Sequence, residues 1–233
     1  SYRLGSFSAH NNKNDKKMAT QPIPGDTTII ELYEPKKVVG QSELSISNAI
    51  HIYKDTFFQN TSETKNTSNF GDSGYCNIDV SCTEGDDWNS EINSTAMYQL
   101  NSTFCSGTLI NNTANNEEQY FLTAYHCIYN KDNYLSSLIT YFNWQVDSCD
   151  SSTIPSYDSV VGAELILMDQ ESDVALLKIS TSIPDSYGVS YAGWNRSVTN
   201  NTNTTVIHHP SGDVKKISLD NDAPISSETD WLE

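Results

Sequence analysis

The sequence predicts an all-β fold, either a barrel or a sandwich, and three observations support this. From Gly71 onward, short runs of alternating apolar and polar residues are separated by clusters of turn-forming residues. This pattern is typical of half-buried strands. No helical periodicity extends beyond about two turns. The 233 residues are enough for one large β domain or two smaller ones.

The clearest strand patterns lie between residues 120 and 180. Tyr120–Ala124 is a compact apolar run, and Leu138–Val146 alternates so that Leu138, Phe142, Trp144 and Val146 share one face. Leu165–Met168 is continuously apolar, which predicts a strand buried on both faces. Asp173–Ser180 alternates again, and one set of its side chains is expected to face a core: Ala175, Leu177 and Ile179.

Residues 1–70 have a different character from the rest of the chain. Thr28–Tyr33 and Leu44–Tyr53 have strand-like patterns. Because a few short strands bury little surface alone, we expect them to belong to an upstream domain. Gln59–Phe70 is almost entirely polar and is predicted to be a linker. We expect both ends of the sequence to be cuts in a longer precursor, so that the domain in residues 71–233 is incomplete at its C-terminus.

The chain is strongly acidic, with 30 Asp and Glu residues against 13 Lys and Arg residues and a formal net charge of −17. This charge would repel the phosphates of nucleic acid and an anionic membrane surface. The sequence also contains no run of about 18 apolar residues that could span a bilayer. We therefore expect neither nucleic acid nor a membrane as a partner. The acidity serves either solubility or a preference for basic substrates.

The five cysteines indicate a disulfide framework. None of them forms a Cys-x-x-Cys pair, which argues against a zinc or thioredoxin-type site. Disulfides persist in oxidising compartments, so we expect a secreted, extracellular protein. An odd number requires a partner elsewhere, which we expect in the part of the precursor that this sequence lacks. The cysteines are Cys76, Cys82, Cys105, Cys127 and Cys149.

Two motifs in the second half of the chain indicate catalysis. Leu122–Cys127 places His126 directly before a cysteine at a predicted strand end, and Ser172–Leu177 places Asp173 at the start of a strand. Histidine can act as a general base near neutral pH, and an aspartate can fix its tautomer and orientation. A histidine beside a cysteine is by itself more often structural, but the two flanking strands favour the catalytic interpretation.

Histidine, then aspartate, then serine is a known chain order of Ser-His-Asp triads. No plausible serine nucleophile follows Asp173 before Glu233. Gly71–Gly74 resembles the start of a nucleophile motif, but it precedes His126, and Tyr75 stands where a second glycine would follow. The sequence therefore indicates a fragment of a serine endopeptidase that lacks its nucleophile, and we expect the fragment alone to be inactive.

We expect neither a metal nor an organic cofactor. His208 and His209 are adjacent, and neighbouring residues of a strand point to opposite faces, so they cannot chelate one ion together. The sequence has no H-E-x-x-H motif of the zinc peptidases. We expect the two histidines to fix a turn with Pro210.

Residues 71 to about 219 resemble the lysyl endopeptidases, which are bacterial secreted members of the chymotrypsin-like serine protease family. The resemblance rests on an ordered set of segments in addition to the histidine motif. These segments are Gly71–Val80, Cys82–Asp86, Gly107–Asn115, Ala192–Arg196 and Ile207–Pro210.

The resemblance implies a chymotrypsin-like double antiparallel β-barrel. Residues 71–180 would supply most of the first barrel, and residues 181–233 would open a second barrel that is truncated here. Residues 1–70 would be the end of a pro-region or accessory β domain with a linker. The missing C-terminal half of the protease domain would then be a partner of this fragment, beside protein or peptide substrates.

The resemblance also implies roles for single residues. His126 would be the general base, and Asp173 would orient it. Trp194 corresponds to a tryptophan near the active site, although an aromatic anchor between strands is an equal alternative for it. The implied disulfides join Cys105 to Cys127 and Cys82 to Cys149, and they leave Cys76 unpaired. A rival function from another class is a secreted adhesin or binding module that keeps the protease fold without activity.

Overall fold

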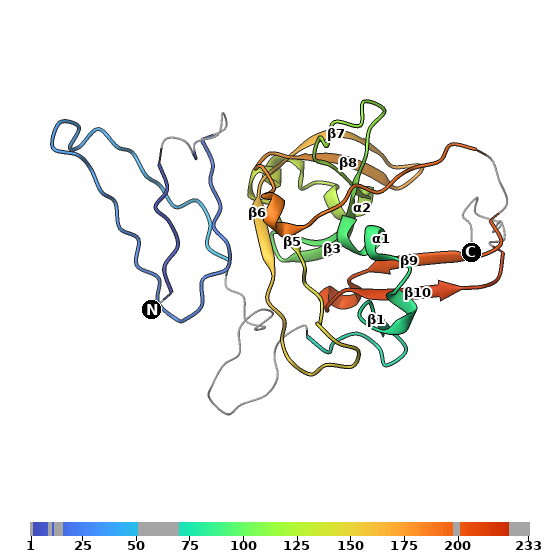
Figure 1. Cartoon of the computed structure of the whole chain (residues 1–233). Coiled ribbons are helices and arrows are strands. Elements are labelled where there is room, and N and C mark those ends of the chain that lie inside the picture. Colours follow the sequence, from blue (N-terminus) through green and yellow to red (C-terminus); the bar gives the residue numbers. More distant parts are fainter. Residues whose placement is uncertain (1, 9–10, 12–15, 51–69, 198–200, 224–233) are drawn as a thin grey trace.

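The computed structural model describes residues 2–8, 11, 16–50, 70–197 and 201–223. In this part of the chain two antiparallel sheets dominate, and helices are short (Figure 1). The larger sheet has seven strands in the order β6-β5-β2-β3-β4-β8-β7, and it curls into a half-barrel. The smaller sheet has three strands in the order β1-β10-β9. The predicted all-β class is confirmed, and the seven-stranded sheet forms a curled half-barrel.

The strands are β1 (Ile78–Asp79), β2 (Thr95–Leu100), β3 (Thr103–Ile110), β4 (Tyr120–Ala124), β5 (Ile139–Phe142), β6 (Asp158–Val161), β7 (Ala163–Asp169), β8 (Val174–Ile179), β9 (Thr204–His208) and β10 (Lys216–Asp220). The helices are α1 (Asn89–Ser94) and α2 (Tyr125–Ile128). Short 3₁₀ turns lie at Thr83–Gly85, Asp132–Ser137, Asp185–Tyr187 and Pro210–Gly212. No helix in the described part of the chain is long and apolar enough to cross a membrane.

The main core lies inside the curled sheet. As the alternation predicts, Ala175, Leu177 and Ile179 of β8 are buried there together with Phe121 of β4. Burying a large apolar side chain contributes about 1.5–3 kcal/mol. Gly107 of β3 is required by this packing, because a Cβ atom there would lie 2.3 Å from the Phe121 ring. The core fixes β4 and β8 side by side.

The prediction that Leu138, Phe142, Trp144 and Val146 share one face is wrong. The strand ends at Phe142, and Asn143 adopts a left-handed conformation with φ of 59°. This turn redirects the chain, because the left-handed region interrupts an extended strand. Leu138 and Phe142 therefore pack in the main core, whereas Trp144 and Val146 are buried in a second cluster with Met97 and Tyr141.

The prediction that Leu165–Met168 is buried on both faces is also wrong. These residues lie in β7, which is an edge strand of the seven-stranded sheet and pairs only with β8. Ile166, Leu167 and Met168 are each more than a third exposed. A bulge between Leu165 and Leu167 interrupts the register. A strand is buried on both faces only when other elements cover both faces of its sheet, and the exposure of these three side chains shows that β7 is not covered in this way.

The strand expected at Thr28–Tyr33 does not form, and residues 44–50 are not a strand either. Ile29 is 88% exposed, and Leu44 and Ile46 are exposed as well. An alternating run becomes a strand only when another strand satisfies its backbone groups, and no described segment pairs with either run. The end of the second run, at residues 51–53, and the predicted linker up to residue 69 lie outside the described residues.

Candidate active site

The structure brings His126 and Asp173 together although 47 residues separate them in the chain. Strands β4 and β8 pair antiparallel, with Ala124 opposite Val174. The end of β4 therefore lies beside the start of β8, and the residues that flank this pair of strand ends meet. The Nδ1 atom of His126 lies 2.7 Å from Oδ2 of Asp173. Because a carboxylate accepts hydrogen bonds, the ring donates from Nδ1.

The backbone holds this pair in place at several points. The N–H of His126 donates to Oδ1 of Asp173 over 2.9 Å, and the N–H of Tyr125 donates to the Asp173 carbonyl over 3.0 Å. Asp173 has a φ of 50°, a left-handed conformation that aspartate tolerates better than most residues. Its own N–H donates to the carbonyl of Gln170. Both carboxylate oxygens are thus directed at the same histidine.

These contacts keep the Asp173 carboxylate ionised. The hydrogen bond from the His126 backbone N–H is the main cause that lowers the pKa of Asp173, and partial burial opposes it. The His126 side chain itself is 70% exposed. In residues 70–197 and 201–223, no hydroxyl or thiol hydrogen-bonds to its ring. The arrangement is a histidine oriented by an anion on one edge and open to solvent on the other.

The disulfide between Cys105 and Cys127 anchors the helix that carries His126. Cys127 follows His126 in α2 and is buried against the main core, and Cys105 lies in β3. The second disulfide joins Cys82 to Cys149. Both bonds have the pairing that the resemblance implies, and Cys76 is a free, exposed thiol. The first disulfide fixes the backbone directly after the histidine.

The structure does not bring Trp194 to this pair. Its indole N–H donates to the Asn111 carbonyl over 2.9 Å, just beyond the end of β3. That end of β3 pairs with Tyr120, at the start of β4. His126 follows the opposite end of β4, about 13 Å along the strand. In these contacts Trp194 links two chain segments, which corresponds to the anchor alternative.

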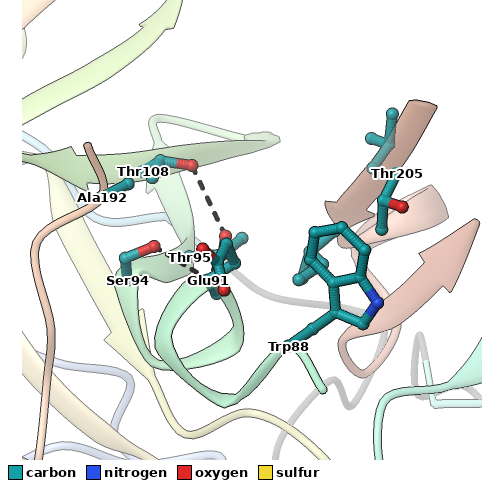
Figure 2. A pocket seen from close by; sticks show the side chains of 9 residues that line it. Trp88, Glu91, Ser94, Thr95, Thr108, Ala192 and Thr205 are labelled. Atoms are coloured by element: carbon teal, nitrogen blue, oxygen red, sulfur yellow. Dashed lines mark hydrogen bonds between the residues drawn. The ribbon is translucent and has the colours of Figure 1, made fainter. Parts of the chain in front are cut away.

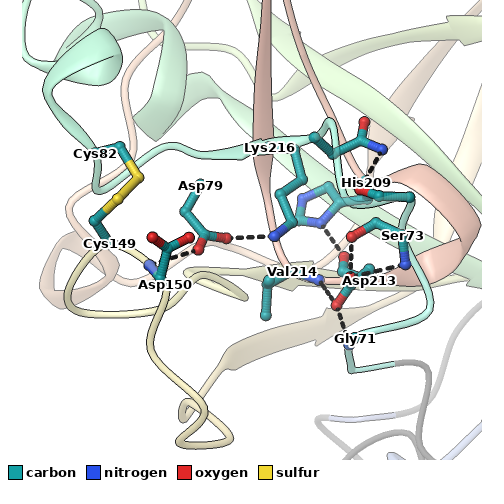
Figure 3. A network of polar contacts seen from close by, with 12 residues as sticks. Gly71, Ser73, Asp79, Cys82, Cys149, Asp150, His209, Asp213, Val214 and Lys216 are labelled. Atoms are coloured by element: carbon teal, nitrogen blue, oxygen red, sulfur yellow. Dashed lines mark hydrogen bonds and ion pairs between the residues drawn. A yellow bond between two sulfur atoms is a disulfide. The ribbon is translucent and has the colours of Figure 1, made fainter.

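The Gly-Asp-Ser-Gly segment lies elsewhere as well. The hydroxyl of Ser73 donates to the carboxylate of Asp213, beside the smaller sheet (Figure 3). His209 is buried beside the same residue, and its Nδ1 donates to the Asp213 carbonyl over 2.9 Å. Burial, and then the charge of Lys215, lower the pKa of His209 to about 3. Ser73 therefore has no general base of the kind that His126 could be.

The histidines His208 and His209 do not form a metal site in the described residues. The ring of His208 contacts the Ser218 hydroxyl, whereas His209 is directed to Asp213. The one group with metal-like spacing among the described residues consists of Cys82, Cys149 and Asp150. Its two sulfurs are joined in the disulfide and hence are not thiolate ligands.

Tyr125 and Gln170 also contact Asp173 through the backbone, and sequence analysis assigned neither of them a role in the site. The Tyr125 ring packs against Tyr129 with centroids 5.2 Å apart, and its hydroxyl is 3.4 Å from the Gln170 side chain. Burial is the main cause that raises the pKa of Tyr125. The bulky residue directly before His126 was the available signal. Gln170 left no signal, because its role arises from the turn between β7 and β8.

A hollow of about 270 Å³ lies between α1 and β9, away from His126 and Asp173 (Figure 2). It is lined by Trp88, Glu91, Ser94, Thr95, Thr108, Ala192, Thr205, Val206 and Ile207. Neither residue of the pair lines it. The hollow is therefore separate from the candidate catalytic pair.

Comparisons with known proteins agree on a family. Residues 70–231 match the family described as "Lysyl endopeptidase, C-terminal domain". The chain is 30% identical over 214 residues to a lysyl endopeptidase of Pseudomonas aeruginosa, and the match covers 85% of this chain and 45% of that relative. The chain thus spans about half the length of this relative. The chain belongs to the lysyl endopeptidase family.

Solved structures include a similar protein at low identity. The crystal structure of the Rv3671c protease in an inactive form aligns with a TM-score of 0.39 and 12% sequence identity. The alignment covers 63% of this chain and 60% of that one.

Proposed function

We propose that this member of the lysyl endopeptidase family hydrolyses peptide bonds as a serine endopeptidase. In this proposal His126 is the general base and Asp173 is the residue that orients it. The observation that carries the proposal is the 2.7 Å contact between Nδ1 of His126 and Oδ2 of Asp173. The backbone hydrogen bond from His126 to the same carboxylate supports it further.

The geometry suits the chemistry of such a triad. With Nδ1 donating to Asp173, the neutral ring presents Nε2 as a proton acceptor. As a serine hydroxyl attacks the substrate carbonyl, its proton moves to Nε2, and the carboxylate stabilises the resulting cation. The proton then passes to the leaving amine, and water later releases the acyl group in the same manner. We place the serine and the oxyanion hole in a segment that follows residue 233.

The proposal also covers the domain organisation, the substrates and the location of the enzyme. Residues 71–233 would be the larger part of a protease domain, completed by its C-terminal half, and residues 1–70 would be the end of a pro-region or accessory β domain. The substrates would be proteins or peptides. Two disulfides are typical of an oxidising compartment, which supports a secreted enzyme.

The test is Asp173→Asn in the protein that includes the segment after residue 233. An amide at this position stabilises the wrong tautomer of the histidine, and we expect turnover of peptide substrates to fall about 10⁴-fold, the figure known for a related triad. The matched control is Asp169→Asn, because Asp169 is a carboxylate of the same turn that bonds only to Ser172 among the described residues.

We expect the Asp169→Asn variant to keep turnover within about threefold of the parent, as is usual for an exposed substitution away from the reacting groups. A loss below tenfold in Asp173→Asn would remove Asp173 from the mechanism. A parent protein that binds peptides without cleaving any would favour the rival function of an inactive binding module.

A further inference from the structure

Two tyrosines lie beside His126 at the two ends of the same short helix. The rings of Tyr125 and Tyr129 pack together, with centroids 5.2 Å apart and planes inclined by 33°. Tyr125 is half-buried, whereas Tyr129 is 51% exposed. A single exposed aromatic residue is ordinary on a protein surface, but a contiguous apolar surface often marks a binding site. We call these two rings the aromatic platform.

Tyr75 illustrates the ordinary case. This tyrosine is fully exposed, and its ring contacts no other ring among the described residues. It lies before β1, whose partner is β10 of the smaller sheet. The aromatic platform differs from Tyr75 in two respects, because its rings are paired and because they adjoin the candidate catalytic pair.

Helix α2 separates its side chains into a buried group and an exposed group. Cys127 and Ile128 are buried in the main core. Tyr129 follows directly, and its backbone N–H donates to the Tyr125 carbonyl over 2.8 Å. Residues three positions apart on a helix are neighbours, with Cβ atoms about 5–6 Å apart. Tyr129 therefore stands next to His126, on the side of the helix that faces solvent.

The surroundings hold the Tyr125 ring in a fixed place. Its backbone N–H donates to the Asp173 carbonyl over 3.0 Å, and its hydroxyl lies 3.4 Å from the Gln170 side chain. The disulfide at Cys127 anchors the same helix to β3. A ring that is already ordered loses little conformational entropy when a ligand binds. Tyr125 thus supports Tyr129 as part of a preorganised surface.

A substrate at the proposed active site would pass close to the aromatic platform. The attacking serine oxygen would lie about 3 Å from Nε2 of His126, and the scissile carbonyl about 3–3.5 Å from that oxygen. An extended peptide advances about 3.3 Å per residue. A side chain within two residues of the scissile bond can therefore reach Tyr129.

The chemistry of the platform favours an aromatic or large aliphatic side chain. Aromatic rings that stack offset or edge-to-face attract one another beyond the effect of the area that they bury. The carboxylate next to the platform, Asp173, directs both of its oxygens at His126 and is therefore not free to bind a cation. About half of Tyr129 is open to a partner.

We propose that Tyr125 and Tyr129 form a substrate subsite for an aromatic or large aliphatic side chain within two residues of the scissile bond. Tyr125 orders the Tyr129 ring, and Tyr129 makes the contact that determines the preference. The subsite selects substrates and takes no part in the proton transfers at His126. This inference rests on the proposed function, because it names the substrate class of the same site.

The first experiment measures the preference in the protein that includes the segment after residue 233. A peptide that it cleaves is identified by mass spectrometry, and each position within two residues of the scissile bond is replaced in turn by phenylalanine, leucine, lysine or alanine. We expect one position at which phenylalanine raises kcat/KM about tenfold over alanine. Tyr129→Ala should reduce this ratio to less than about twofold, and Tyr129→Phe should keep it, because the ring remains.

Tyr75→Ala is the matched control, since Tyr75 is an exposed tyrosine outside α2, and it should keep the full ratio. A purely structural defect slows the cleavage of both peptides alike and leaves their ratio unchanged. The proposal is overturned if no position shows a phenylalanine preference that Tyr129→Ala removes. A lysine preference that this variant removes would contradict the proposed class of side chain.

A second measurement, on residues 1–233, needs no turnover. The histidine and tyrosine rings are labelled with carbon-13, and the chain is titrated with N-acetyl-phenylalanine methylamide in an NMR experiment. We expect saturable shifts of the Tyr129 and His126 ring signals, and the shift at His126 should disappear in Tyr129→Ala. N-acetyl-alanine methylamide should bind about fivefold more weakly or less.

The outcomes of this titration separate the subsite from the peptidase activity. Absence of a saturable shift, or equal binding of the two probes, would overturn the subsite. The expected shifts in a protein that cleaves no peptide would support the subsite and remove the proposed function.

Discussion

Two pairs of the same residue types, His126 with Asp173 and His209 with Asp213, differ in almost every physical respect. The His126 ring is mostly exposed and bonds to a carboxylate. The His209 ring is buried and bonds to a backbone carbonyl, and its Nε2 has no hydrogen-bond partner among the described residues. Burial lowers the pKa of His209 to about 3, so it stays neutral at physiological pH. A histidine near an aspartate therefore indicates catalysis only when its ring is both oriented and accessible.

A lysine beside the buried pair, Lys215, is also withdrawn from solvent, which disfavours its charged form. Lys215 is 1% exposed, and its Nζ donates to the Ile92 carbonyl at 2.6 Å and to Gln145 at 3.1 Å. Burial lowers the pKa of its ammonium to about 7. The exposed His126 can gain and lose a proton during a reaction. In the buried region, protonation of Lys215 or His209 instead changes the free energy of unfolding.

The largest effect that we expect from this difference is a rise in stability between pH 7 and pH 10. The folded pKa of Lys215, about 7, lies below the value of 10.5 for a free lysine. In this window the unfolded chain binds more protons, so the free energy of unfolding increases with pH. The full change is on the order of 5 kcal/mol. Urea unfolding of residues 1–233 at pH 6, 8 and 10 measures it.

Lys215→Met should flatten this pH profile, because methionine fills a similar volume and does not titrate. Lys178→Met serves as the control, since the Lys178 side chain is 40% exposed and pairs with Glu118. The control should keep the slope of the parent. A Lys215→Met variant with the parent's slope would show that another group carries the pH dependence.

The second prediction compares how much each of the two histidines contributes to stability. His209→Ala leaves a cavity and an unsatisfied Asp213 carbonyl, and we expect a loss of about 3 kcal/mol in the free energy of unfolding. His126→Ala should change it by about 0.5 kcal/mol or less, because the ring is exposed. Chemical denaturation of both variants checks this order. The comparison fails if His126→Ala proves the more destabilising of the two.

The smallest effect is expected at Trp194, which lies away from both pairs. Trp194→Ala removes one hydrogen bond and a half-exposed indole ring, and it should cost about 1 kcal/mol of stability. Turnover in the complete protein should change less than threefold. Trp194→Phe keeps the ring and removes only the N–H, so it separates the two contributions. A hundredfold loss of turnover in Trp194→Ala would place this side chain at the active site after all.

The local sequence pattern predicted burial correctly where the surroundings of a residue follow from its neighbours in the chain. The alternation in β8 predicted which side chains face the core, since successive residues of a strand point to opposite faces. It failed in β7, because burial on both faces depends on whether other elements cover the two faces of the sheet. It failed again at Thr28–Tyr33, where no described strand pairs with the run.

For the candidate site, the sequence by itself determined the residue types: a histidine at one strand end, an aspartate at another strand start, and a cysteine that could fix the first. The tertiary structure decided which of these meet. It aligned β4 with β8 so that His126 lies on Asp173, placed Trp194 at the other end of β4, and buried His209 with Asp213. The physical reason is that contact and burial depend on pairing between distant segments, which side-chain packing of the whole domain selects.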